Sequence, residues 1–304
     1  MAVLTFFQNN PDLLFFVAQS ALLALSLYLP FSTGQLSLAS PAFFAIGGYV
    51  AAILSVNPAH AASLAWLHQQ LGLGGVYLLE FVLAILIDGV VGLVVGILAL
   101  RLRGIYLALA TIALIEIVQV VANNLIVTGG ATGIFSIPRL SNSWQIWAVL
   151  LVAALLLWRL ERSRVGRAFR AIREDEVAAE AMGVDTTHYK VMAFTLGAIL
   201  AGITGVLGAH FLNTWNPSQG TFNGSIDELS WVIVGGSQSF LGPILGATLL
   251  TLLPEVLRFL QNFRLIVDGA LLVLVTIFLP RGISGLRLRR GAPKRNRAIR
   301  EPGD

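Results

Sequence analysis

The amino-acid sequence predicts an all-α polytopic membrane protein: a bundle of about eight to ten transmembrane helices, some broken or re-entrant. Three observations predict this class. The 304 residues are 56% hydrophobic and only 12% charged, whereas a soluble domain is about a quarter charged. Apolar runs of roughly 20 residues recur along the chain, and such a run can cross a hydrocarbon core of about 30 Å. The basic residues gather in a few connecting segments, as they do in cytoplasmic loops.

The hydrophobic segments follow one another at about 13–31, 36–56, 76–100, 104–126, 144–160, 189–212, 229–253 and 266–280. Glycine and proline interrupt the second and seventh segments. In the seventh, Gly235-Gly236 and Gly242-Pro243 predict two half-spans or a re-entrant hairpin, with the split near Gly242-Pro243. Such breaks are tolerated in lipid only where protein covers the backbone or the backbone lines a cavity.

Three basic clusters predict the topology. Arg101 and Arg103 share one connector, six arginines lie within 159–173, and eight basic residues lie between Arg281 and Arg300. The positive-inside rule places all three clusters on the cytoplasmic side. Segment 127–143 is then expected outside and 159–190 inside. A cytoplasmic tail requires three crossings within 229–280. Counting backward from Arg101 places the N-terminus outside, unless 13–73 contains a further crossing or a re-entrant segment.

Two carboxylates fall in the middle of apolar segments. Asp88 lies in LLEFVLAILIDGVVGLVVG, and Glu116 lies in LALATIALIEIVQVVANN. A charge at the bilayer centre costs about 2.5–3.5 kcal/mol on insertion scales, so each should face protein or water. Either residue is thus a candidate for a translocation path, or for a structural hydrogen bond between helices.

Small residues recur at the spacing of helix packing. Gly92 and Gly96 form a GxxxG pair. A second ladder, on one face of the segment 189–212, consists of Gly197, Ala201, Gly205 and Ala209. Small residues at four-residue spacing let helix backbones approach closely in lipid, which predicts a tightly packed bundle.

The segment 159–190 is a polar island between two spans, and it carries its own helical pattern. Val165, Phe169 and Ile172 fall on one face at a period of 3.6 residues, and arginines occupy the rest. This pattern predicts an amphipathic helix at the inner membrane surface.

A second short helix is expected at about 174–184. Acidic residues in its first turn favour the positive end of the helix dipole, and Gly183 is a natural stop. Its opening residues are Glu174, Asp175 and Glu176, and its small apolar face consists of Val177, Ala178, Ala181 and Met182. Asp185, Thr186 or Thr187 can cap the next helix. Such a helix fits a groove of a partner protein, and the alternative is a loop bound to lipid headgroups.

Several functions are excluded or weakened by residues that the chain lacks. The absence of cysteine excludes disulfides and thiolate chemistry, and the four histidines show no metal-ligand spacing. No GxxxxGK[ST] run is present to hold nucleotide phosphates. The topology already accounts for the basic tail, so no nucleic-acid partner is expected.

Six separated motifs resemble one family. The run GRAFRAIREDEVAAEAMGVD resembles the cytoplasmic segment of high-affinity branched-chain amino acid permeases, the LivM-like subunits of bacterial ABC importers. The other similar runs, in order, are GQLSLASPAFFAIGGYVAA (34–52), GIYLALATIALIEI (104–117), TGGATGI (128–134), a late motif (225–258) and FLPRGISGL (278–286).

The resemblance implies a transport subunit without an ATPase site of its own, in a bacterial plasma membrane. Residues 1–286 would form a single permease domain with 159–190 as its coupling loop, and 287–304 a basic, disordered cytoplasmic tail. The implied partners are a LivH-like sister permease, two cytoplasmic subunits that hold ATP-Mg, a periplasmic or lipid-anchored binding protein, and membrane lipid. No cofactor is expected on this chain.

The resemblance also assigns roles to residues. The coupling helix would enter a groove on an ATPase subunit through Glu174, Asp175, Glu176, Val177, Glu180, Ala181, Met182 and Gly183. Two alternatives stay open. Related ABC permeases carry urea, short amides or other small polar solutes, and a stand-alone secondary transporter would need no docking helix.

Overall fold

The computed structural model describes residues 11–56, 61–99, 102 and 104–256. Within these ranges the chain is a helical bundle, and its β-structure is one antiparallel pair of two-residue strands. Five of the described helices are long and apolar enough to cross a membrane. These are α2 (Pro11–Phe31), α4 (Ala61–Ala99), α5 (Ile105–Asn124), α6 (Ser143–Arg162) and α9 (Thr186–Leu212). The all-α membrane fold class is therefore confirmed.

Shorter elements complete the described chain. They are α3 (Ser40–Ser55), α7 (Arg164–Glu174), α8 (Glu176–Ala181), α10 (Phe222–Gly235), α11 (Leu241–Val256), the strands β1 (Ile134–Phe135) and β2 (Thr214–Trp215), and the 3-10 turns η1 (Gly130–Thr132) and η2 (Pro217–Gln219). Each of the first seven predicted segments contains a helix. The segment 266–280, the Arg101–Arg103 cluster and the basic tail lie outside the described residues, apart from Leu102.

The central pair of helices is α3 and α9, which pack closely along their length. A methyl group added at Gly205 would collide with the carbonyl oxygen of Phe44, so only glycine permits this approach. All four residues of the second small-residue ladder are buried, namely Gly197, Ala201, Gly205 and Ala209. Gly92 and Gly96 of α4 face Ala198 and Phe194 of α9. Small residues thus bring α3 and α4 against the same helix.

The seventh hydrophobic segment is split into two helices, as predicted, and the break lies just before Gly242-Pro243. The chain leaves the helix at Gly236 and resumes it at Leu241, so Gly242 and Pro243 lie in the first turn of α11. Proline is tolerated there because the first backbone N–H groups of a helix have no partner within it. The break is the turn 236–240, and α10 begins at Phe222, seven residues before the predicted segment.

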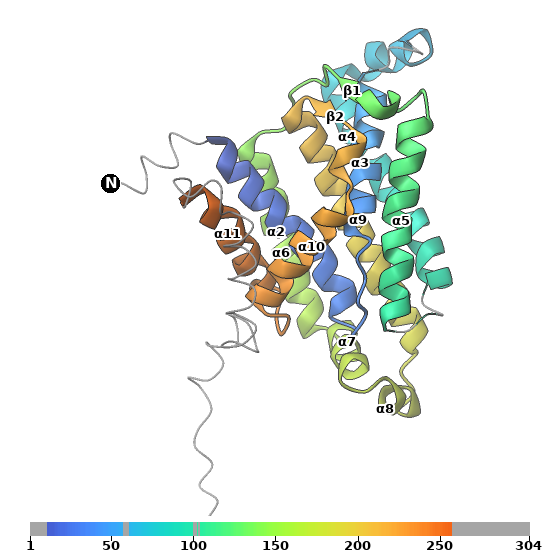
Figure 1. Cartoon of the computed structure of the whole chain (residues 1–304), viewed down its shortest axis with the longest axis vertical. Helices are drawn as coiled ribbons and strands as arrows, with labels where there is room; N and C mark the ends of the chain where they lie inside the picture. Colours follow the sequence, from blue (N-terminus) through green and yellow to red (C-terminus); the bar gives the residue numbers. More distant parts are fainter. Residues whose placement is uncertain (1–10, 57–60, 100–101, 103, 257–304) are drawn as a thin grey trace, which may run out of the picture.

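The two ends of the bundle carry different elements. Figure 1 shows α7 and α8 at one end, and β1 and β2 at the other. Helix α2 runs between these ends. Near its start, Asp12 pairs with Arg139 at 3.3 Å, and at its close the ring of Phe31 lies under the Arg173 guanidinium. Segments 127–143 and 159–190 therefore lie at opposite ends, as the charge pattern predicts.

Candidate functional site

Helix α7 is anchored on the bundle by one apolar face. Its N-cap is Ser163, whose Oγ accepts hydrogen bonds from the N–H groups of Val165 at 3.1 Å and Gly166 at 3.4 Å. Phe169 and Ile172 are each 3% exposed, and Val165 is half-buried. The apolar stripe read from the sequence therefore packs on the rest of the protein.

Helix α8 is a separate short element with a cap at each end. The Asp175 carboxylate accepts a hydrogen bond from the N–H of Ala178 at 3.0 Å. At the other end, the N–H of Gly183 donates to Glu180 O at 2.9 Å, and the N–H of Val184 donates to Ala179 O at 3.1 Å. These two bonds form a Schellman motif, which requires the positive φ of 84° at Gly183.

The expected start of this helix was wrong by two residues. Glu174 is the last residue of α7, and Asp175 is the extended residue between the two helices. Because the Asp175 side chain caps α8, the chain turns here rather than continuing one helix. Six residues of the predicted coupling set belong to α8 or its C-terminal cap: Glu176, Val177, Glu180, Ala181, Met182 and Gly183.

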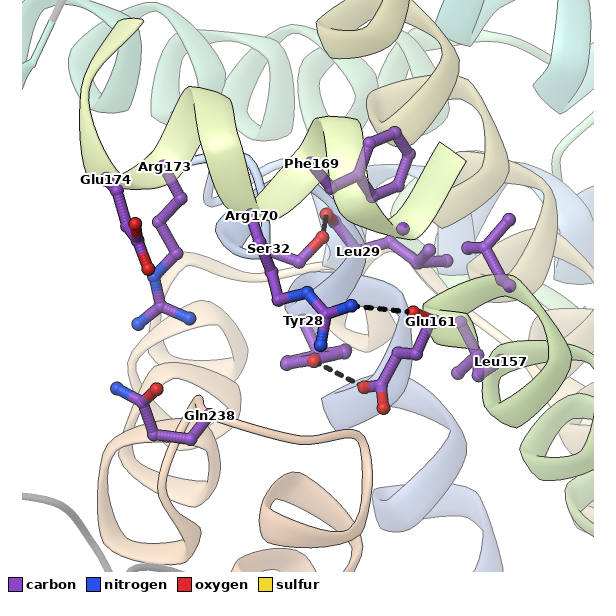
Figure 2. A pocket seen from close by; sticks show the side chains of 12 residues that line it. Tyr28, Leu29, Ser32, Leu157, Glu161, Phe169, Arg170, Arg173, Glu174 and Gln238 are labelled. Carbon is purple, nitrogen blue, oxygen red and sulfur yellow. Dashed lines mark hydrogen bonds between the residues drawn. The ribbon is translucent and has the colours of Figure 1, made fainter. Parts of the chain in front are cut away.

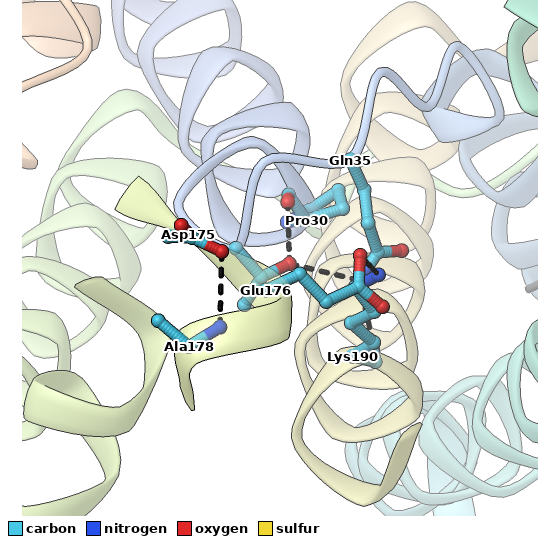
Figure 3. Close-up of polar contacts among 7 residues, drawn as sticks. Pro30, Gln35, Asp175, Glu176, Ala178 and Lys190 are labelled. Carbon is cyan, nitrogen blue, oxygen red and sulfur yellow. Dashed lines mark hydrogen bonds and ion pairs between the residues drawn. The ribbon is translucent and has the colours of Figure 1, made fainter. Parts of the chain in front are cut away.

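The base of α8 is fastened to α9. Glu176 pairs with Lys190 at 2.5 Å, and the carbonyl of Lys190 accepts a hydrogen bond from Gln35 Nε2 at 3.1 Å. Figure 3 shows these groups converging from α8, α9 and the segment after α2. Asp185 caps α9 by accepting a bond from the N–H of His188 at 3.0 Å. The position of α8 is thus set by polar contacts at its base.

The outward face of α8 is apolar and bare. Val177 is 71% exposed and Met182 is 85% exposed, and Ala178 and Ala181 beside them are exposed too. Only Ala179 in this helix is buried. A short helix that is held at its base and leaves its apolar side chains uncovered can be covered by a partner.

The two mid-span carboxylates lie in different surroundings, and the structure does not bring them together. Asp88 is fully buried against Gly202 of α9. Neither of its carboxylate oxygens has a hydrogen-bond partner among the described residues. Glu116 is exposed on the outer face of α5. Since charge is costly in hydrocarbon, the exposed Glu116 needs a protein or water neighbour outside the described chain.

Another buried carboxylate, Glu80, was not predicted from the sequence. Glu80 and His210 are both fully buried, and Glu80 Oε2 lies 2.5 Å from His210 Nε2. The Ser55 hydroxyl donates to Glu80 Oε1 at 2.6 Å. His210 Nδ1 lies 2.7 Å from the Pro138 carbonyl oxygen. Because a carbonyl only accepts, Nδ1 is the donor to Pro138, and Nε2 faces the Glu80 carboxyl group. The pair joins α4 and α9 to the chain beside β1.

A sequence signal for this pair did exist. The Gly92–Gly96 spacing continues backward in steps of four through Asp88, Ala84 and Glu80, and all three are fully buried. The packed face of α4 could therefore have been extended to Glu80. His210 directly follows Ala209, the last residue of the small-residue ladder on α9. Glu80 and His210 therefore both lie beside the faces through which α4 and α9 pack.

Comparison with known proteins identifies the family. The model of the "Branched-chain amino acid transport system / permease component" family matches residues 11–276. The chain belongs to this permease family. LivM, the "high-affinity branched-chain amino acid transport system permease protein" of Salmonella typhimurium, is 32% identical over 306 residues, which cover 88% of this chain and 68% of LivM. LivM of Escherichia coli matches equally well.

A sister component of the same kind of system is also similar to the permease. LivH of Escherichia coli is 33% identical over 143 residues, 46% of each chain. No solved structure matches the permease significantly. These relatives are transport components rather than enzymes, and this permease is a multi-pass membrane protein.

Proposed function

We propose that this permease translocates branched-chain or related amino acids, delivered by a soluble periplasmic or lipid-anchored binding protein, across a bacterial plasma membrane. It pairs with a LivH-like sister permease and two cytoplasmic ATPase subunits, which hold ATP-Mg. The chain itself binds no cofactor and hydrolyses no ATP. The relatives named for these systems support the substrate class, and the absence of a phosphate-binding GxxxxGK[ST] run supports the division of labour.

The observation that carries the coupling role is the bare apolar face of α8. Val177 and Met182 are the most exposed apolar side chains of the polar island. In our proposal they enter a groove of an ATPase subunit, as an amphipathic helix does on a partner. Glu180, also exposed, borders this face and contributes charge complementarity at the rim.

The same proposal fixes the orientation of the bundle. If α8 meets a cytoplasmic subunit, the β1–β2 end faces the binding protein. Helix α2 then starts outside, consistent with the Asp12–Arg139 pair at the strand end. The basic tail would finish in the cytoplasm, in agreement with the positive-inside rule.

Glu116 and Asp88 receive different roles in this proposal. The exposed Glu116 on α5 faces the sister permease or the aqueous path between the two permeases. The buried Asp88 supports the contact between α4 and α9. Glu116→Gln should therefore slow uptake with little effect on thermal stability, and Asp88→Asn should mainly alter the thermal stability of the complex.

The test is reconstitution in liposomes of the permease with its sister permease, both ATPase subunits and the binding protein. We expect ATP-dependent uptake of labelled leucine or a related amino acid, and loss of that uptake with Glu180→Lys while the complex still reaches the membrane. Arg167→Glu is the matched control, because it also reverses an exposed charge in the polar island, but on α7 and away from the apolar face of α8.

Three outcomes would contradict the proposal. Robust ATP hydrolysis by the purified chain alone would refute the division of labour. Ion-driven uptake by the chain alone would show a secondary transporter. Uptake of urea or short amides in place of amino acids would keep the ABC mechanism and overturn the substrate class.

A further inference from the structure

Arginine 173 joins the coupling loop to a distant part of the bundle. Its Nη1 donates to the Ser237 carbonyl oxygen at 2.5 Å, and its Nη2 donates to Ser237 Oγ at 2.7 Å. The same guanidinium lies 5.5 Å from the ring centroid of Phe31. Figure 2 shows Arg173 reaching from α7 toward the turn that carries Gln238. A guanidinium with two parallel donors fixes both the distance and the orientation of its acceptor.

The other end of that turn is held as well. Glu161 Oε1, at the end of α6, accepts hydrogen bonds from the Phe240 N–H at 2.8 Å and the Tyr28 hydroxyl at 2.7 Å. Arg170 of α7 donates to the Glu161 carbonyl oxygen at 3.1 Å, as Figure 2 shows. The turn 236–240 is therefore tied at one end to the C-terminal end of α7, through Arg173, and at the other to the end of α6, through Glu161.

Polar bonds carry much of the connection between α7 and the turn. A cavity of about 210 Å³ lies between them, and its lining includes Tyr28, Arg170, Arg173 and Gln238. Because both α7 and the turn border this cavity, the two Arg173 hydrogen bonds to Ser237 are a direct link between them.

The helices on either side of the turn are packed as one unit. A methyl group at Gly235 would collide with the Gly242 carbonyl oxygen, and one at Gly246 would collide with the Trp231 carbonyl oxygen. The α10 and α11 backbones therefore touch directly, without side chains between them. A displacement of Ser237 would therefore move α10 and α11 together. Both helices pack against α2.

We infer that Arg173 is a positioning residue that transmits the displacement of α8 to the α10–α11 hairpin. This inference rests on the proposed ATPase-coupling role of α8. Only Asp175 separates α7 from α8, so a displacement of α8 acts directly on α7. The buried side chains of Phe169 and Ile172 hold α7 against the bundle, so α7 moves as a rigid helix. The coupling loop thus acts on the bundle at two points: through Lys190 on α9, and through Arg173 on the hairpin.

The test uses the reconstituted complex and measures ATP hydrolysis and amino acid uptake on the same liposomes. For Arg173→Gln we expect uptake per ATP hydrolysed to fall about tenfold or more, with ATP hydrolysis near the wild-type rate. Arg167→Gln is the matched control, because Arg167 is exposed on the same helix and its side chain donates to the neighbouring Arg162 carbonyl. It should leave the ratio unchanged.

Two milder substitutions, each of which keeps part of the Arg173–Ser237 contact, separate a loss of coupling from misfolding. Ser237→Ala keeps the bond to the carbonyl, and Arg173→Lys keeps the positive charge on a single nitrogen but loses the two-nitrogen fork, so each should reduce the ratio of uptake to hydrolysis by about two- to fivefold. If Arg173→Gln does not reach the membrane, the ratios of uptake to ATP hydrolysis in Ser237→Ala and Arg173→Lys test the inference instead. Wild-type ratios in both would overturn the inference, as would a wild-type ratio in Arg173→Gln.

The two proposals fail in different ways. If α8 does not dock, changes at Met182 will leave the affinity for the ATPase subunits unaltered. If α8 docks but Arg173 carries no displacement, the Met182 variants will lose ATPase binding, while Arg173→Gln will bind the ATPase subunits and transport normally.

Discussion

Two consecutive helices of the polar island have opposite relations to the protein. Helix α7 buries its apolar side chains, with Phe169 3% exposed, and its arginines reach α6 and the turn 236–240. Helix α8 leaves Met182 85% exposed and makes polar contacts only around its base. Helix α7 is packed into the bundle, whereas α8 projects from it with its apolar face uncovered. The composition of the two helices does not predict this difference, since both have an apolar face.

The largest expected effect comes from removing the anchor of α7. Phe169→Ala should lower the free energy of unfolding by about 3 kcal/mol, because it leaves a cavity where a buried ring stood. Thermal unfolding of the purified permease in detergent measures this loss. Phe169→Leu, which keeps most of the volume, should cost clearly less. An unchanged melting temperature in Phe169→Ala would show that α7 is not anchored by this face.

A change at Gly183 should affect α8 alone. Gly183→Val places a β-branched side chain at a φ of 84°, which costs about 1–3 kcal/mol of local strain. We expect ATP-driven uptake to fall while the melting temperature of the bundle stays constant. Gly183→Asn is the control, because asparagine tolerates this conformation. Equal loss of uptake in both variants would point to the glycine's small size rather than its backbone conformation.

The exposed face of α8 should matter to a partner and not to the fold. Met182→Ser and Val177→Ser should each weaken binding of the ATPase subunits about tenfold, since a buried apolar side chain contributes about 1.5–3 kcal/mol. The free energy of unfolding of the isolated permease should change by less than about 0.5 kcal/mol. Co-purification at graded protein concentrations gives the affinity. Wild-type affinity in the double variant would exclude this face as the docking surface.

The smallest effect is expected at the base of α8. Lys190→Met removes the ion pair with Glu176, whose side chains are 13% and 29% exposed, and should cost no more than about 1 kcal/mol. The backbone carbonyl of residue 190 still accepts the bond from Gln35. High salt should weaken coupling only slightly in the wild type, because salt screens a partly buried ion pair less than an exposed one, and it should leave the Met variant unaffected. A large loss of stability in this variant would place the anchor of α8 here rather than along α7.

Much of this architecture could be predicted from local patterns. Apolar runs identify the helices, and the arginines place 159–190 and 127–143 at opposite ends. Gly183 and Asp185 act through neighbours fewer than five residues away, so their capping positions are visible in the sequence. The start of α8 was misjudged because Asp175 can either continue a helix or cap the next one. Only the backbone turn between α7 and α8 distinguishes the two.

Other features depend on contacts between residues far apart in the chain. Glu80 and His210 meet across 130 positions, and Arg173 meets Ser237 across 64. The sequence by itself determined the class of fold, most helix boundaries to within a few residues, with the starts of α4 and α10 as the exceptions, and the presence of a short helix in the polar island. Those properties follow from local periodicity, capping and solvation. The tertiary structure decided which apolar face is covered and which polar groups are paired, because burial depends on how the helices pack.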